Sequence, residues 1–89
     1  MNYYYIEGNC LQERKQAHRY LAQVLRFPDY YGNNLDALAD CLSEMSYRNV
    51  IIISDSEKIV ENLGDYGQSM LEVFEEQASM PYSFKLIER

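Results

Sequence analysis

The sequence predicts an α/β fold, a small three-stranded parallel sheet packed with about four helices in a single domain over residues 1–89. Segments with the composition of strands alternate with segments of helical periodicity, which is the order of a parallel sheet with helical connections. One strand segment, Val50–Ile53, consists of four consecutive branched residues, as is typical of a central strand covered on both faces. With 89 residues, of which 47% are hydrophobic, the chain can bury one core but not two.

The N-terminal part predicts a strand followed by an amphipathic helix. Asn2–Ile6 is rich in aromatic and branched residues and closes at Gly8, which favours a strand. From about Gln12 to Arg26, apolar residues recur at the spacing of a helix that buries one face and presents a basic one. The residues expected inside are Ala17, Leu21, Val24 and Leu25, and those expected at the surface are Arg14, Lys15, His18, Arg19 and Gln23.

The second predicted helix carries carboxylates on its outer face. Pro28 ends the first helix, the next five residues form a loop, and Asn34 is placed to cap a helix from Leu35 to about Met45. Successive residues of a helix are about 100° apart, which assigns each side chain to a face. The residues expected to face the core are Leu35, Leu38, Cys41, Leu42 and Met45, and those expected to face solvent are Asp36, Asp40, Ser43 and Glu44.

The C-terminal half predicts the central strand, two helices and a last strand. Val50–Ile53 should be the central strand, and the short helix after it should end at Gly64, because glycine tolerates the closing geometry. A longer helix spans 65–78, and residues 83–88 alternate as a strand does. These helices are expected to bury Ile59, Val60, Leu63, Met70, Leu71, Phe74 and Ala78 and to expose Glu72, Glu75 and Glu76.

The chain is acidic, with a formal net charge of −6 and a pI near 4.6. Such a chain repels nucleic acid phosphates and attracts cationic surfaces, so we expect no direct binding to nucleic acid. From residue 33 to residue 80 the sequence has ten acids against Arg48 and Lys58, a charge of −8, whereas the first helix is basic. This acidic pole suits a basic protein partner, although an acidic surface that is merely solvated has the same composition.

No segment predicts a membrane span, a disulfide scaffold or an export signal. The longest aliphatic run is Val50–Ile53, far short of the roughly 20 residues needed to cross a bilayer. Cys10 and Cys41 have neither the spacing of a metal site nor the density of a disulfide framework, and the N-terminus lacks a charged region followed by an apolar one. We therefore expect a cytoplasmic protein with free thiols that does not bind membranes.

The sequence lacks the residues that an enzyme, a metal site or a cofactor site would need. His18, the only histidine, falls among charged residues and is expected to be a solvated surface side chain, while Cys41 is expected inside as a small apolar residue. Asp36 and Asp40 could serve a hydrolase as acid and base, yet an exposed helix lacks the apolar cleft that separates two pKa values, and their spacing matches no calcium loop. We expect no catalytic residue, no cofactor and no metal, with a small hydrolase or a purely structural domain as alternatives.

A resemblance to a known family favours a binding function. The stretch 27–42, FPDYYGNNLDALADCL, closely resembles the segment of barstar-family inhibitors in which a proline, paired tyrosines and a glycine lead into an LDALxDxL helix. The similarity extends more weakly through IIIS and GQSMLEVFEE. In that family a three-stranded parallel sheet packed with helices inhibits an extracellular barnase-type ribonuclease by inserting the second helix and the preceding loop into its active site. The resemblance implies contacts from Tyr30, Gly32, Asn34, Leu35, Asp36, Asp40 and Glu76, to which the same helix adds Ala39, Ser43, Glu44 and Met45.

Two positions depart from the family pattern. The family prototype has tryptophans just before the key aspartate and after the helix, where this chain has Ala39 and Met45. Aromatic contact area is therefore lost, and the identity of the target stays open. We expect a one-to-one inhibitor, monomeric when free, of a basic extracellular ribonuclease, with Asp40 imitating an RNA phosphate. The alternative is an immunity protein against a different nuclease or toxin that uses the same acidic surface.

Overall fold

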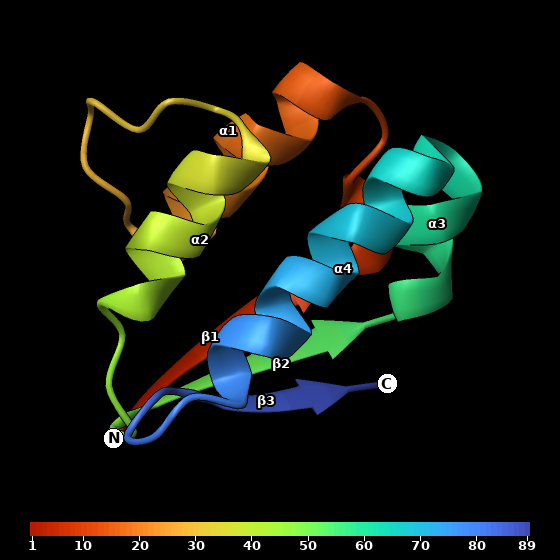
Figure 1. The fold of residues 1–89 in the computed structure, drawn as a ribbon. Coiled ribbons are helices and arrows are strands. Elements are labelled where there is room, and N and C mark those ends of the chain that lie inside the picture. The colour runs from red at the N-terminus through yellow and green to blue at the C-terminus, as the bar shows by residue number, and fades with distance from the viewer.

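The computed structural model describes all residues from 1 to 89 and contains a three-stranded parallel sheet with four helices, as the sequence predicts (Figure 1). The strand order is β1-β2-β3, so the strand built on Val50–Ile53 is central, and Tyr3 of β1 and Lys85 of β3 are both in register with Val50. In chain order the elements are β1 (Asn2–Glu7), a short 3-10 turn (Gly8–Cys10), α1 (Arg14–Leu25), α2 (Leu35–Ser43), β2 (Asn49–Ser54), α3 (Ser56–Leu63), α4 (Asp65–Ala78) and β3 (Lys85–Glu88).

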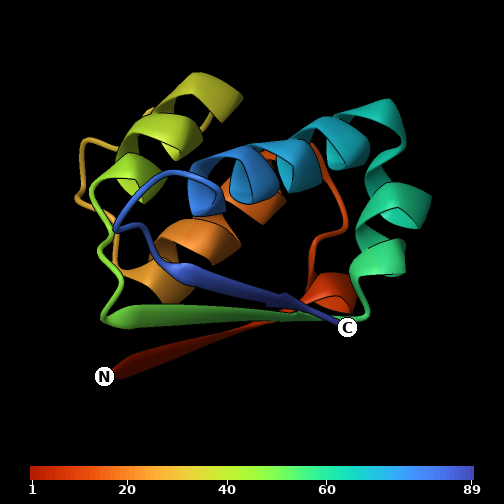
Figure 2. The same cartoon turned by 60° about the horizontal axis from the view of Figure 1, so that its bottom comes forward.

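All four helices lie on one face of the sheet, which Figure 2 shows from the side. Ile51 and Ile53 point into this helical layer and belong to the main core. Val50 and Ile52 point to the opposite face and are still only 5% and 6% exposed. The prediction of continuous burial along β2 is therefore confirmed. The expectation that β2 is covered on both faces is wrong, because helices pack on only one face of the sheet. The outer face has no helices, and the neighbouring side chains of the sheet shield β2 there.

The core forms where α1, α2 and α4 meet the inner face of the sheet. Phe74 of α4 and Phe84, which precedes β3, are each 1% exposed and are the largest buried side chains. Full burial of a side chain of this kind contributes about 1.5–3 kcal/mol. The inward faces expected from helical spacing are confirmed for most positions, with Ala17, Leu21, Leu25, Leu38, Leu42, Ile59, Met70 and Leu71 buried and Val24, Leu35, Cys41, Met45, Val60, Leu63 and Ala78 half-buried.

Two glycines allow close backbone approaches that the sequence alone does not reveal. A Cβ atom at Gly8 would overlap the carbonyl oxygen of Asp55, and one at Gly67 would overlap the carbonyl oxygen of Ile59. Gly67 therefore lets α4 pack directly against the backbone of α3. None of the four helices combines the length and the apolar character that crossing a bilayer requires.

Candidate partner-binding surface

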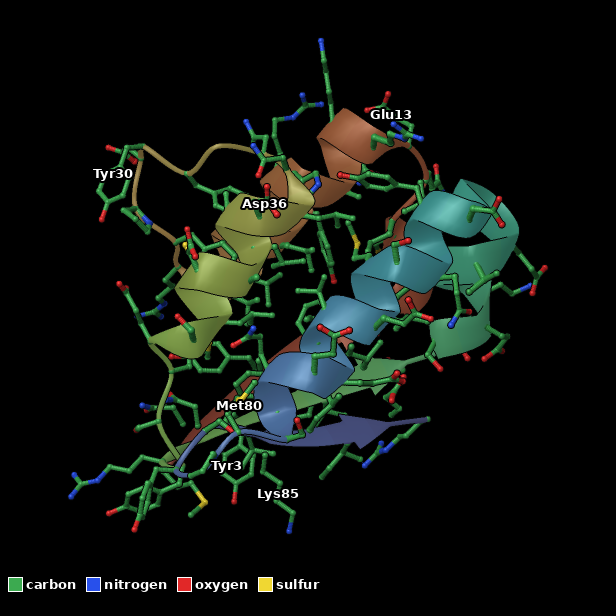
Figure 3. The ribbon with its side chains drawn as sticks, in the orientation of Figure 1. Tyr3, Glu13, Tyr30, Asp36, Met80 and Lys85 are labelled. Atoms are coloured by element: carbon green, nitrogen blue, oxygen red, sulfur yellow. The ribbon has the colours of Figure 1, made fainter.

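The outer side of α2 presents an acidic face, which we define as Asp36, Asp40, Ser43 and Glu44. All four side chains are exposed, as predicted, while Leu38 and Leu42 on the opposite side of the helix are fully buried and hold α2 on the core. Asp36 and Asp40 are one helical turn apart, so both carboxylates project to the same side. Figure 3 shows Asp36 on the N-terminal turn of α2. The helix thus fixes a row of negative charges on a rigid element.

No basic side chain neutralises this acidic face. The single salt bridge of the structure joins Lys58 Nζ to Glu61 Oε1 at 3.5 Å, within α3. Asp36, Asp40 and Glu44 therefore have no cationic partner in the free protein. The two exposed carboxylates within α2 and the third at its C-cap, Glu44, repel one another weakly, and a cationic partner would relieve that repulsion.

Asn34 caps α2 and fixes the entry of the preceding loop, as the sequence predicts. Its Oδ1 accepts a hydrogen bond from the backbone N–H of Ala37 at 2.7 Å, and its Nδ2 donates to the carbonyl of Gly32 at 3.2 Å. The first contact satisfies one of the free N–H groups at the start of the helix, and the second holds the loop against it. Asp36 lies in this first turn, where the helix dipole stabilises a negative charge.

The paired tyrosines of the loop have opposite environments. The N–H of Tyr31 donates to the carbonyl of Pro28 at 2.9 Å, which closes a turn, and the ring of Tyr31 packs on Phe27 with centroids 4.9 Å apart. Tyr31 is consequently 8% exposed, whereas Tyr30 is 86% exposed and projects from the tip of the loop (Figure 3). The buried tyrosine anchors the loop, and the ring of the exposed one, a predicted contact residue, is accessible to solvent.

The expectation that His18 is a solvated surface residue is wrong, because the side chain is 1% exposed. Its Nδ1 lies 2.7 Å from the hydroxyl of Tyr31, and its Nε2 lies 2.7 Å from the hydroxyl of Tyr66 on α4. The two hydroxyls satisfy both ring nitrogens, and this makes burial of the polar ring tolerable. Burial lowers the pKa of His18, so the ring is neutral at pH 7 and uses one nitrogen as donor and the other as acceptor. His18 thus ties the loop before α2 to α1 and α4.

Glu76, the predicted contact outside α2, lies on α4, which runs beside α2 in the same helical layer (Figure 1). Of all the predicted contact residues, Tyr30, Gly32, Asn34, Asp36, Asp40, Ser43, Glu44 and Glu76 are exposed, and Leu35, Ala39 and Met45 are half-buried. Glu72 and Glu75 are also exposed on α4, and Glu75 lies beside Glu88 of β3. The half-buried residues can contribute only the outer part of their side chains to a contact.

The two cysteines and the possible metal ligands are the remaining side chains with reactive or coordinating groups. Burial, followed by the nearby carboxylates of Glu44 and Asp40, raises the pKa of the Cys41 thiol, which therefore stays protonated. Cys10 is exposed, and neither cysteine forms a disulfide. No group of three or more histidine, cysteine or acidic side chains is placed to hold a metal ion. The surface around α2 therefore consists of an acidic helix, the loop held by its cap, and the exposed Tyr30.

The fold and this surface together define a small α/β binding protein that presents negative charge on a helix. Residues 1–84 match the family model described as Barstar (barnase inhibitor). A curated protein of Bacillus subtilis (strain 168), named "Putative ribonuclease inhibitor YrdF", is 37% identical over 84 residues, which cover 92% of each chain. The chain belongs to the barstar family, as its resemblance in the loop and second helix indicates. Members of this family are inhibitors rather than enzymes, which agrees with the expectation from the sequence.

Proposed function

We propose that this protein inhibits a basic, extracellular, barnase-type ribonuclease by binding it one-to-one and covering its active site with α2 and the loop before it. The observation that supports this most directly is the row of exposed, unpaired carboxylates on α2 of a barstar-family chain. The name of the relative from Bacillus subtilis, which describes a ribonuclease inhibitor, points to the same activity. The protein would act in the cytoplasm, on nuclease that has not yet left the cell.

The chemistry of RNA cleavage explains why an acidic helix can block it. A ribonuclease holds phosphates with arginine, lysine and histidine side chains, and a fixed carboxylate accepts the same charge-assisted hydrogen bonds. Asp40, in the middle of α2, would take the place of a phosphate, and Asp36 would add a second charge one turn earlier. Tyr30 would supply rigid aromatic contact area beside the charges. Substrate is excluded because its binding groups are already occupied.

Carboxylates around this central pair would mainly guide the approach of the enzyme. Glu44 on α2 and Glu72 and Glu75 on α4 are exposed and have no salt-bridge partner. Long-range attraction raises the association rate and is screened by salt, whereas a buried hydrogen-bonded charge controls dissociation. We therefore expect association to slow as ionic strength rises, and Asp40→Ala to act mainly by speeding dissociation. Stopped-flow association at several salt concentrations measures both effects, and a salt-independent association rate would contradict the role of the acidic surface.

The residue pattern also supports a second candidate, an immunity protein against a different nuclease or toxin. Ala39 and Met45 replace the aromatic residues of the family pattern, and both are half-buried, so the apolar part of the contact surface is reduced. Methionine adapts its shape more readily than an aromatic ring. A target that differs from the ribonuclease of the prototype, or one that binds in a shifted pose, would suit this smaller surface.

Titration of nuclease activity tests the proposal and separates the two candidates. Increasing amounts of the protein are added to a barnase-type ribonuclease and to a panel of other basic nucleases, and cleavage of RNA or DNA is followed. The proposal predicts that the ribonuclease loses all activity at one equivalent, and that Asp40→Ala inhibits only at a large excess. Glu61→Gln, which removes a carboxylate from α3, is the matched control and should inhibit as the unmodified protein does. Inhibition of another nuclease instead would favour the immunity role, and inhibition of none would refute both.

A further inference from the structure

The outer edge of β1 is open and lacks the usual protection of an edge strand. β1 is at one margin of the sheet, and only its inner side pairs with β2 (Figure 2). From Asn2 to Ile6 the strand has no charged residue and no proline, and its middle is three consecutive tyrosines. Natural edge strands are commonly protected by lysine, proline or a bulge, because an unprotected edge pairs with another strand.

The backbone groups that this edge offers can be identified. The N–H of Asn2 donates to the carbonyl of Arg48 at 2.9 Å, so Asn2, and by the alternation of a strand Tyr4 and Ile6, direct their N–H and C=O groups toward β2. Tyr3, Tyr5 and Glu7 direct theirs away from the sheet. The N–H of Glu7 donates to the hydroxyl of Tyr20 at 2.9 Å and is already satisfied. Tyr3 and Tyr5 are the two residues whose N–H and C=O groups are left for another strand.

A shallow groove runs along this edge. It has a volume of about 600 Å³ and is lined by Met1, by residues 2–5 of β1, and by Val24 and Arg26 at the end of α1. Arg26 is the only charged residue among them. Because no residue of α2 or α4 lines the groove, it is separate from the acidic face and from Glu76.

We propose that β1 pairs antiparallel with β1 of a second copy of this chain, which joins the two sheets into one six-stranded sheet. The open groups fix the register. When Tyr3 of one copy lies opposite Tyr5 of the other, each such pair exchanges two N–H···O=C hydrogen bonds, and the two pairs use every open group. Other antiparallel registers direct Tyr3 or Tyr5 toward Glu7, whose N–H is satisfied, or toward the residue before Asn2. In this register Tyr3 and Tyr5, which are 56% and 63% exposed, also become cross-strand aromatic neighbours.

The charges beside the groove suit this arrangement. α1 returns antiparallel to β1, so Arg26 lies near the start of the strand, and Glu7 lies at its end. Antiparallel pairing brings the Glu7 carboxylate of each copy to the end where Arg26 of the other copy lies. The pairing departs from our expectation of a free monomer, but it leaves both acidic faces available, so each copy can still bind one nuclease. Two short strands form a small interface, which is typical of a weak dimer.

Sedimentation velocity over a range of protein concentration tests the pairing, and it does not depend on the proposed function. The proposal predicts a shift from 10.5 kDa toward twice that mass as concentration rises. Tyr5→Pro removes an outward N–H but no bond to β2, and should raise the dimer dissociation constant at least about tenfold, because two hydrogen bonds are lost from each dimer. Tyr82→Ala is the control, since Tyr82 is 84% exposed and lies outside β1, and it should leave the dimer unchanged.

A charge exchange provides a second test that keeps every backbone N–H and C=O group of β1. Arg26→Glu and Glu7→Arg should each weaken the dimer, and the double variant should restore most of the association. A chain that stays at 10.5 kDa at every concentration would overturn the proposal. So would a dimer that both Tyr5→Pro and the charge variants leave intact, because such a dimer would use another surface of the molecule.

Discussion

The hydrogen bond between Tyr31 and His18 allows a direct test of how the loop before α2 is held in place. The substitution Tyr31→Phe keeps the ring that packs on Phe27 and removes only the hydroxyl, which lies 2.7 Å from His18 Nδ1. In the unmodified protein no buried polar side-chain atom lacks a partner. The substitution therefore loses a hydrogen bond and leaves a buried ring nitrogen unsatisfied, which together cost about 1–3 kcal/mol. In a domain of this size, about 2 kcal/mol lowers the Tm by roughly 8–16 °C.

The matched control is the adjacent Tyr30→Phe. Tyr30 is 86% exposed and its hydroxyl makes no hydrogen bond within the protein, so its loss should change the free energy of unfolding by less than about 0.5 kcal/mol. Urea denaturation of both variants measures the difference, with an unchanged m-value showing that the unfolded state is comparable. Equal stability of Tyr31→Phe and the unmodified protein, or equal losses in the two variants, would refute the conclusion that His18 anchors the loop through Tyr31.

Three further predictions concern the cap of α2, the packing of α4 and the pH dependence of stability. Asn34→Ala removes the acceptor for the N–H of Ala37 and should reduce stability by about 1 kcal/mol, seen as a Tm lower by about 4–8 °C; an unchanged Tm would mean that the cap is dispensable. Gly67→Ala places a methyl group against the carbonyl of Ile59 and should reduce the free energy of unfolding by about 1–3 kcal/mol in urea denaturation; unchanged stability would mean that the two helices can move apart without cost. The pKa of His18 lies below its ordinary 6.5 because of burial, so the unfolded chain binds the proton first and stability falls as the pH drops below about 6.5. Burial, followed by the neighbouring Glu75, raises the pKa of Glu88 to about 7 from 4.5, so its contribution changes in the opposite direction and is lost as the pH rises from about 4.5 to about 7. Glu88→Gln should therefore make the loss of stability on acidification steeper, and denaturation at a series of pH values that shows no change in slope would contradict it.

Periodicity predicted the elements well where one face of a segment is clearly apolar. The spacing of Met70, Leu71 and Phe74 against a run of glutamates predicted the helix over 65–78, and α4 spans Asp65–Ala78. Asn34 was identifiable as a cap because asparagine is strongly preferred at the position before the first turn of a helix, where its side-chain oxygen accepts a hydrogen bond from a free N–H group. The acidic face of α2 followed from the same reasoning, since residues one turn apart share a side of a helix.

Features that depend on contacts between distant segments could not be predicted in this way. His18 is adjacent to Ala17 on α1 and close to the inner face, but its burial depends on hydroxyls supplied by Tyr31 and by Tyr66, which lies 48 residues further along the chain. The sequence shows a histidine among charged residues and carries no sign that two tyrosines will satisfy it. The close approach of α4 to α3 at Gly67 is likewise a property of the packed helices.

The sequence also did not predict correctly which faces of the sheet the helices cover. A run of four branched residues indicates burial on both faces, and Val50 and Ile52 are indeed buried. The pattern does not distinguish burial under helices from burial beside the side chains of adjacent strands. On the outer face, side chains of the adjacent strands shield Val50 and Ile52. This is also why the open edge of β1, with its uncharged tyrosines, emerges only once the strand order is known.

Calorimetric titration of the protein into a catalytically silenced barnase-type ribonuclease measures whether the acidic face of α2 binds the enzyme, with Asp40→Ala and Glu61→Gln titrated in parallel. We expect one-to-one binding that Asp40→Ala weakens by at least about 1.5–3 kcal/mol, the contribution of a hydrogen bond to a charged group, and that Glu61→Gln leaves unchanged. Equal affinity of Asp40→Ala and the unmodified protein would show that the acidic face of α2 is not the binding surface.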